Sequence, residues 1–417
     1  MPPTPLLAEA SLNGDWKSLF FIVLVAAAIP LLVGLLNIRV AEVVFLIVGG
    51  IILGPEVLGL ATITDAITLM SELGLGFLFF FAGYELDRAA LRGQTGGLAL
   101  VGWVVSVGLA VTAVTLLVSG GIIQDALGVA IALTSTALGT LLPVIRDNGL
   151  LDTVFGRNFM AAGAIGEFGP IVAIAVLLGS RSSWLAFLVL LAFLVLAVLV
   201  AIIPRSLLTP RVIAIIERGH STSAQTAVRI VVLLLVGLLT LATNFQLDIV
   251  LGAFAAGIIV RLYVPHGSVS PIGSKIEAVA FGLFIPLFFV VTGVRLDIIS
   301  ILENPGRLLL FFVLLLLVRG LPQMLIYRRS IPNVRERAEL SLYIGTALPI
   351  IVAVTTVQME AGVMLPANGA ALVGAGALSV LVFPIVAQML GSKARSGPGA
   401  TDADAVQGDT SRDASVE

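Results

Sequence analysis

The sequence predicts an all-α polytopic membrane protein of about thirteen transmembrane helices. Of its 417 residues, 59% are hydrophobic and only 12% are charged, and its mean hydropathy is +1.12. Soluble domains carry about twice that charged fraction. Because backbone polar groups in lipid must be satisfied within the same segment, we expect the membrane-spanning segments to be helices.

Apolar runs bounded by glycine, proline or charged residues set the limits of these helices. In chain order, the predicted helices are residues 18–36, 40–54, 66–87, 95–119, 122–145, 157–179, 183–203, 225–243, 247–264, 275–295, 306–327, 336–358 and 367–390. The polar stretch after Gly391 is too short and too poor in apolar residues to fold. We therefore divide the chain into a transmembrane domain at residues 1–391 and a disordered cytoplasmic tail at residues 392–417.

Basic residues are unevenly distributed between the connections. If the N-terminus lies outside, the inward connections hold most of the arginines and lysines, whereas the outward ones hold only Lys17, Arg181, Arg295 and Arg307. Positive charge gathers on the cytoplasmic side of membrane proteins. The pattern predicts a multi-pass plasma-membrane protein, in contact with lipid, with its N-terminus outside and its C-terminus in the cytoplasm.

Two predicted helices contain signals that interrupt a straight helix. The fifth contains Thr134, Ser135 and Thr136, whose hydroxyls compete for backbone partners. The twelfth contains Pro349 in mid-segment, where the ring removes an intrahelical hydrogen bond. The two helices lie seven apart and so enter the membrane from opposite sides. Interrupted helices at matching positions of inverted halves indicate a transporter binding site; the alternative is a proline kink and a Ser/Thr packing seam.

Glu167 is the acidic residue that the sequence places deepest in an apolar segment. It follows Arg157 by ten residues, which corresponds to about 15 Å of helix in a hydrocarbon layer of about 30 Å. An ionised carboxylate there costs several kcal/mol unless it has a partner, so such a residue is a candidate functional site. The alternative is a structural acid paired to a neighbouring helix.

The surroundings of Glu167 favour the binding of a small cation. Glycines at positions 163, 166 and 169 flank it, and small residues let other helix backbones approach closely. The broken fifth helix would then bring Thr134, Ser135 and loosened carbonyls beside the carboxylate. Burial favours the protonated form of a carboxylate, whereas a bound cation favours the ionised form. One group can hold either a proton or a cation, which is the minimal chemistry of an antiporter.

Arg319 is a second deep charge, midway between Arg307 and Arg328. Snorkelling explains charges near helix ends, but this residue is too central for it. We expect it to face the interior, near Glu167 or near the carbonyl end of a broken helix. An arginine balances charge but does not release a transported proton. The alternative is a structural ion pair without a role in transport.

Other features of the sequence exclude several classes of function. The chain has no cysteine, no Walker loop, no nucleotide fingerprint and no metal-ligand cluster. It also lacks a basic stripe with interleaved aromatic residues, so we expect no nucleic-acid partner. We predict no enzymatic activity and no cofactor besides transported ions. Most of the acidic residues near the predicted outer helix ends, namely Asp65, Glu72, Asp125 and Asp248, are expected to be solvated. Glu85 and Asp87 are expected to close the third helix at the inner surface as solvated caps, which is favoured over ligand binding.

Several stretches of the chain resemble bacterial monovalent cation:proton antiporters, of the branch that includes Kef-type potassium efflux systems and sodium/proton antiporters. They are FFAGYELD (residues 80–87), IALTSTALGTLLPVIRDNGLL (131–151), LDIVLGAFAAGI (247–258) and IPLFFVVTGVRLD (285–297). The resemblance extends over most of residues 15–390. It implies inverted repeats with two crossed broken helices. A moving core at about residues 95–179 and 306–390 would shift like an elevator against a dimerisation domain in a homodimer.

The resemblance also assigns residues to the site. Glu167 lies where the family has the second acid of an Asp-Asp or Asn-Asp pair, and Arg319 lies where it often has a core lysine. Thr134, Ser135 and Thr136 match the unwound part of the fifth helix. The chain departs from the family in having Gly166 as the first member of the pair. One titratable group then remains, which predicts electroneutral one-for-one exchange, and the short tail lacks the nucleotide-binding regulatory domain of Kef-type systems.

Together, these patterns predict an antiporter that exchanges protons for Na⁺ or K⁺. Glu167 would bind the proton or the monovalent cation, with Thr134 and Ser135 as auxiliary ligands. Arg319, Thr136 and Gly166 would form its immediate surroundings. Two alternatives stay open at this point: a sodium-coupled symporter of an organic solute, because similar folds serve that function, and a membrane sensor or scaffold that has lost transport.

Overall fold

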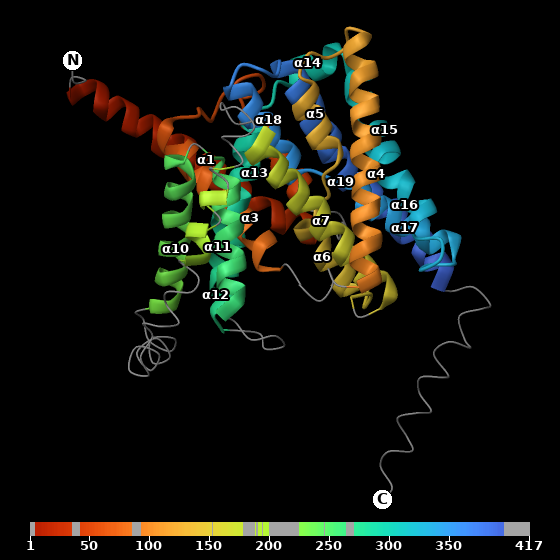
Figure 1. The fold of residues 1–417 in the computed structure, drawn as a ribbon. Helices are drawn as coiled ribbons and strands as arrows, with labels where there is room; N and C mark the ends of the chain where they lie inside the picture. The colour runs from red at the N-terminus through yellow and green to blue at the C-terminus, as the bar shows by residue number, and fades with distance from the viewer. Residues whose placement is uncertain are drawn as a thin grey trace, which may run out of the picture.

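The helices follow the apolar runs of the sequence, although the first begins earlier, at Pro5, and the last ends later, at Arg395. The computed structural model describes residues 5–35, 42–85, 93–151, 153–177, 188, 191–193, 195–199, 225–245, 247–263 and 271–395. Over these residues the secondary structure is helical, without strands (Figure 1). The elements are α1 (Pro5–Leu35), α2 (Glu42–Leu53), α3 (Asp65–Tyr84), α4 (Gly93–Ser119), α5 (Ala126–Leu133), α6 (Leu138–Asp147), α7 (Val154–Leu177), α10 (Thr226–Asn244), α11 (Ile249–Tyr263), α12 (Pro271–Val279), η1 (Ala280–Phe284), α13 (Ile285–Val294), α14 (Ile298–Glu303), α15 (Pro305–Leu314), η2 (Leu315–Gly320), α16 (Leu321–Ile326), α17 (Val334–Gly345), α18 (Pro349–Glu360) and α19 (Pro366–Arg395).

Among the described residues, eight helices are long and apolar enough to cross a membrane, and three shorter apolar segments accompany them. Every predicted helix except residues 183–203 has a helical counterpart. That segment lies largely outside the described residues, although 188, 191–193 and 195–199 are helical. The predicted tail also lies outside them from residue 396 onward. The all-α polytopic architecture is confirmed.

Both predicted interruptions are present. The fifth predicted helix divides into α5 and α6 around residues 134–137, and the twelfth divides into α17 and α18 around residues 346–348. At the first break, the hydroxyls of Thr134 and Ser135 donate to the carbonyls of Ile131 and Ala132 at 2.8 and 2.7 Å. These bonds add to the ones that the same two carbonyls accept from the Thr134 and Ser135 N–H groups at the end of α5. At the second break, Pro349 is the first residue of α18, where its missing N–H is tolerated.

The two breaks cross each other in the middle of the fold. The Ala137 N–H donates to the Thr346 carbonyl at 2.8 Å, and the Thr136 hydroxyl donates to the Ile344 carbonyl at 2.8 Å. Backbone groups that lost their helical partners therefore find them in the opposite broken helix. These hydrogen bonds between the two broken helices explain why non-helical backbone is tolerated in the middle of the fold.

The helices that follow the two broken pairs repeat one arrangement. In the first half, Oε1 of Glu167 on α7 accepts from the Leu138 N–H, where α6 begins. In the second half, the Ser379 hydroxyl on α19 accepts from the Ala347 N–H, just before α18. The halves differ because α18 starts with Pro349, which has no N–H to offer a ligand. The half-helix start at α6 therefore keeps the stronger capacity to hold an anion.

Two sets of helices pack around this crossing (Figure 1). In one set, α3 packs against α11 and α13, and α2 packs against α13. In the other set, α4 packs against α7, and α19 packs against α15 and α17. Close backbone contact between α3 and α11 depends on Gly83 and Gly257, because a Cβ on either would overlap a carbonyl of the facing helix.

Candidate functional site

The carboxylate of Glu167 lies at the N-terminus of α6. Its Oε1 accepts hydrogen bonds from the backbone N–H groups of Leu138 at 2.9 Å and Gly139 at 3.3 Å. The first amides of a helix lack intrahelical partners and carry the positive end of its dipole, so they bind anions well. Glu167 is only 5% exposed. Its side chain therefore points into the protein, toward the break in the fifth predicted helix.

The second carboxylate oxygen of Glu167 is in a different situation. Oε2 is buried and has no hydrogen-bond partner within the described part of the chain. In that same part, the ion pair that the structure holds joins Arg295 to Glu360, not Glu167 to a cation. One oxygen is thus fixed by amides and the other is left for a ligand or a proton.

Arg319 lies at the crossing of the broken helices and is held by groups other than this carboxylate. It is fully buried and belongs to η2, a π-helical turn between α15 and α16. Its Nε donates to the Thr136 hydroxyl at 2.9 Å and its Nη2 donates to the Ala162 carbonyl at 2.9 Å. Its Nη1 has no partner among the described residues. As expected, this arginine faces the interior near a broken helix, because it bonds to Thr136 in the break between α5 and α6.

Gly166 makes room for that arginine. A Cβ at position 166 would overlap Nη2 of Arg319 and would lie 2.6 Å from the Thr136 hydroxyl oxygen. The Gly166 carbonyl accepts from the Thr136 N–H at 3.1 Å. Gly166 thus contributes space and one backbone bond at the centre of the fold.

Thr134 and Ser135 lie in the break, 4% and 1% exposed. Their hydroxyl hydrogens point to carbonyls of α5, which leaves oxygen lone pairs for another ligand. Within the described residues no hydrogen bond joins either hydroxyl to Glu167. Thr136, in contrast, joins α17 to Arg319 and Gly166. The sequence predicted neither this linking role of Thr136 nor the bonds from the amides of Leu138 and Gly139 to Glu167. No sequence pattern shows which side chain a freed backbone group will meet.

Glu85 is a further residue that the sequence placed differently. It was expected to be solvated at the end of α3, but it is half-buried, and its Oε2 is buried without a partner among the described groups. Burial raises the pKa of Glu85 to about 7, although Arg146 and Arg261 favour its charged form and Glu277 opposes it. It lies close enough to Glu167 for their charges to repel. Position at a helix end gave no sign of this burial.

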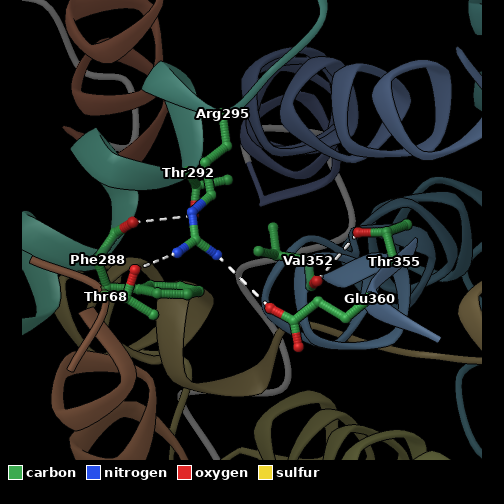
Figure 2. Close-up of polar contacts among 7 residues, drawn as sticks. All are labelled: Thr68, Phe288, Thr292, Arg295, Val352, Thr355 and Glu360. Atoms are coloured by element: carbon green, nitrogen blue, oxygen red, sulfur yellow. Dashed lines mark hydrogen bonds and ion pairs between the residues drawn. The ribbon is translucent and has the colours of Figure 1, made fainter. Parts of the chain in front are cut away.

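A cavity of about 650 Å³ opens between α3, α13, α18 and α19. Figure 2 shows Arg295 on its wall, where the guanidinium donates to the Thr68 hydroxyl at 2.7 Å and pairs with Glu360 at 3.8 Å. Glu167 does not line the cavity, but Ile174 does. Ile174 follows Glu167 by seven residues on α7, or about 10 Å along the helix.

The cavity wall is rich in carboxylates. Glu72, Asp248, Asp297 and Glu360 line it together with Arg295. Burial raises the pKa of Asp248 to about 6, against a backbone hydrogen bond from Val250 that favours its charged form. Hydrogen bonds from Ser300 lower the pKa of Asp297. The excess of negative charge favours cations near this face.

Known proteins resemble this chain in sequence and in fold. The chain is 23% identical over 390 residues to the putative Na⁺/H⁺ antiporter YjbQ of Bacillus subtilis, covering 88% of this chain and 62% of that protein. It is 27% identical over 384 residues to the glutathione-regulated potassium-efflux system protein KefC of Escherichia coli O81, covering 90% and 60%. The chain thus spans about three fifths of the length of these curated relatives.

A solved structure has the same architecture. The sodium proton antiporter MjNhaP1 from Methanocaldococcus jannaschii superposes with a TM-score of 0.59 at 13% identity, covering 90% of this chain and 95% of that one. At that identity the likeness shows the fold, including its membrane-spanning helices. Residues 17–393 match the family described as sodium/hydrogen exchanger, transmembrane, and the chain therefore belongs to the sodium/hydrogen exchanger family.

Proposed function

We propose that this protein is a secondary active antiporter, which exchanges Na⁺ or K⁺ for protons across the plasma membrane. One observation carries the proposal: Glu167 is a buried carboxylate with one oxygen held by half-helix amides and the other without a partner. A group so placed binds a proton or a cation at Oε2 without losing its position. Antiporters among its relatives support the same function.

Alternate binding of a proton and a cation at Glu167 would couple the movement of one to the movement of the other. Desolvation favours protonation of Oε2, whereas an arriving cation replaces the proton and restores the charge balance. The oxygens of Thr134 and Ser135 would complete the cation's ligand set, because hard monovalent cations suit hydroxyl, carbonyl and carboxylate oxygens. Arg319 stays charged and would act as a fixed countercharge beside Gly166 and Thr136.

The stoichiometry follows from the number of carboxylates. With Gly166 in place of a neighbouring acid, Glu167 is the acid that meets the broken helices among the described residues, so each cycle would exchange one proton for one cation. Such exchange moves no net charge and would not respond to the membrane potential.

Movement of the site would complete the cycle. The core helices, α4 to α7 and α15 to α19, would carry the crossing across the membrane against the remaining helices of a homodimer. The N-terminus would lie outside and the C-terminus in the cytoplasm, as the distribution of basic residues indicates.

The test uses everted vesicles and a pH-sensitive dye, with Na⁺ and K⁺ added in turn. We expect cation-dependent proton movement with the wild-type protein and none with Glu167→Gln, which keeps the size of the side chain and removes its charge. The matched control is Glu303→Gln at the exposed end of α14, which should keep full activity. Exchange by Glu167→Gln at the wild-type rate would remove the site assignment.

The same assay separates the alternative functions. Sodium entry without proton movement would indicate a symporter of an organic solute. Silence toward every monovalent cation, in a folded and inserted protein, would indicate a sensor or scaffold.

A further inference from the structure

Three buried polar side chains meet at the end of α5 far from Glu167. Asp125 directly precedes α5, Gln358 is in the last turn of α18, and Asn368 is in the first turn of α19. They are 3%, 5% and 0% exposed. The expectation that Asp125 is solvated at a helix end is therefore wrong, since it is buried and bonded to Asn368 at the start of α19.

Asp125 and Asn368 contact each other, and Gln358 packs beside them against the first turn of α5. The Asn368 Nδ2 donates to Asp125 Oδ1 at 3.0 Å. The Cγ and Cδ atoms of Gln358 lie 3.0 and 3.3 Å from the position of a Cβ on Gly128. Gly128 follows Asp125 by three residues and so lies on the same face of α5. Gln358 is thereby packed within one helical turn of Asp125.

The cluster has more acceptors than donors. Asp125 Oδ2, Gln358 Oε1 and Asn368 Oδ1 are all buried and have no hydrogen-bond partner in the described part of the chain. Buried polar atoms are almost always satisfied in proteins. Three oxygens without a donor therefore require either a cation, which accepts their lone pairs, or a species that donates hydrogen bonds to them.

We propose that Asp125, Gln358 and Asn368 bind a monovalent metal cation at a second site, which is separate from Glu167. A carboxylate and two amide oxygens are ligands that hard cations prefer. The three side chains carry a single formal negative charge, so a monovalent ion leaves the buried cluster neutral whereas a divalent ion leaves it charged. The C-terminal end of α18, at Gln358, adds a partial negative charge that favours the cation.

The three side chains do not line the cavity described above, but chain neighbours of two of them do. Met359, Glu360, Pro366 and Gly369 line that cavity, and they neighbour Gln358 and Asn368 in the chain. The cluster therefore lies near the cavity and at a different place from Glu167. The two positions are separated by the length of α5, about 13 Å from Asp125 to the break at residue 134.

A cation at this place would hold the two broken helices together. It would tie the start of α5 to the end of α18 and to α19, on one side of the crossing. We expect it to stay bound and to stabilise the fold, not to be transported. This role does not depend on the proposed antiport at Glu167.

Thermal unfolding of the purified full chain tests the second site. All proteins carry Glu167→Gln, so that the first site does not contribute. NaCl and KCl are compared with choline chloride at equal ionic strength. We expect the metal salts to raise the unfolding midpoint in proportion to the logarithm of their concentration, as a ligand of the folded state does. Adding Asp125→Asn should weaken that response by about tenfold or more, because the ligand set loses its formal charge.

Two further variants make the outcome decisive. Glu303→Gln removes an exposed carboxylate that does not line the cavity and should keep the full response to metal. If Asp125→Asn does not fold, Gln358→Leu removes one proposed ligand and should also weaken the response. Tl⁺ soaked into crystals should give an anomalous peak bonded to the three oxygens. Equal responses with and without Asp125→Asn, or water alone at the site, would overturn the proposal.

Discussion

The guanidinium of Arg319 lies against the Cα of Gly166, in the space that any side chain at position 166 would need. The glycine and the arginine are thus coupled by packing, with Thr136 bonded to both. The missing acid at position 166 and the arginine at position 319 are two aspects of one arrangement. Because interiors are close-packed, changing one of them alone should disturb the other.

Gly166→Ala should therefore destabilise the protein by about 1–3 kcal/mol, the usual range for overpacking. In the background of Arg319→Lys, the alanine should be tolerated better, since the shorter ammonium head vacates the space. A double-mutant cycle on thermal unfolding measures this coupling, which we expect at about 0.5–3 kcal/mol. Gly237→Ala is the matched control, because nothing lies within 4 Å of a Cβ at that exposed helical position. Simple additivity of the two changes would contradict the packing argument.

Thr136→Val should be more harmful than Thr136→Ser. Valine keeps the shape but removes both the acceptor for Arg319 and the donor to the Ile344 carbonyl. Unsatisfied buried groups cost about 1–3 kcal/mol each, and more for charged ones. Thr112→Val provides the comparison, since that hydroxyl is exposed and bonds within its own helix. Unfolding midpoint and exchange rate should both fall for Thr136→Val and stay near wild type for the serine variant.

Substitution of Arg295 or Glu360 should change the rate of exchange without abolishing it. Their ion pair joins the end of α13 to the end of α18 (Figure 2), and it must break if the core moves. An exposed pair contributes about 0–1 kcal/mol, so Arg295→Gln should change the rate by up to about fivefold. Glu360→Gln should do the same. The exchanged pair, Arg295→Glu with Glu360→Arg, should return the rate toward wild type; additive changes would show that the pair itself does not matter.

Asp248 and Asp297 should differ in how pH controls cation affinity at the cavity. The pKa of Asp248 is raised to about 6, so it is ionised at pH 7.5 and mostly protonated at pH 5. The pKa of Asp297 is lowered, so it is ionised at both. Asp248→Asn should weaken the apparent cation affinity at pH 7.5 but not at pH 5, whereas Asp297→Asn should weaken it equally at both. Identical pH profiles for the two variants would rule out titration of Asp248 as the cause.

The sequence predicted those features of the fold that depend on local chemistry. Pro349 and the hydroxyls of residues 134–136 interrupt their helices whatever those helices pack against, and both breaks are present. Glu167, which the sequence places deep in an apolar segment, is buried in the fold. Its hydrogen-bond partners did not follow from the sequence, because Leu138 lies 29 residues away in the chain.

Burial at helix ends was the main failure of prediction. Asp125 and Glu85 stand at the ends of apolar segments, as solvated residues do. Whether another helix covers such a residue depends on tertiary packing. For the same reason, the expected approach of Arg319 to the break was right, while its actual partner, Thr136, could not be chosen among neighbouring hydroxyls.

Proton release on cation binding is the measurement that tests the shared site most directly. Titration calorimetry of the purified protein with Na⁺ or K⁺, in two buffers of different ionisation enthalpy, counts the protons released per cation. The wild type should release about one proton for each cation bound at Glu167, and Glu167→Gln should release none. Cation binding without proton release in the wild type, or unchanged release in the variant, would contradict the account.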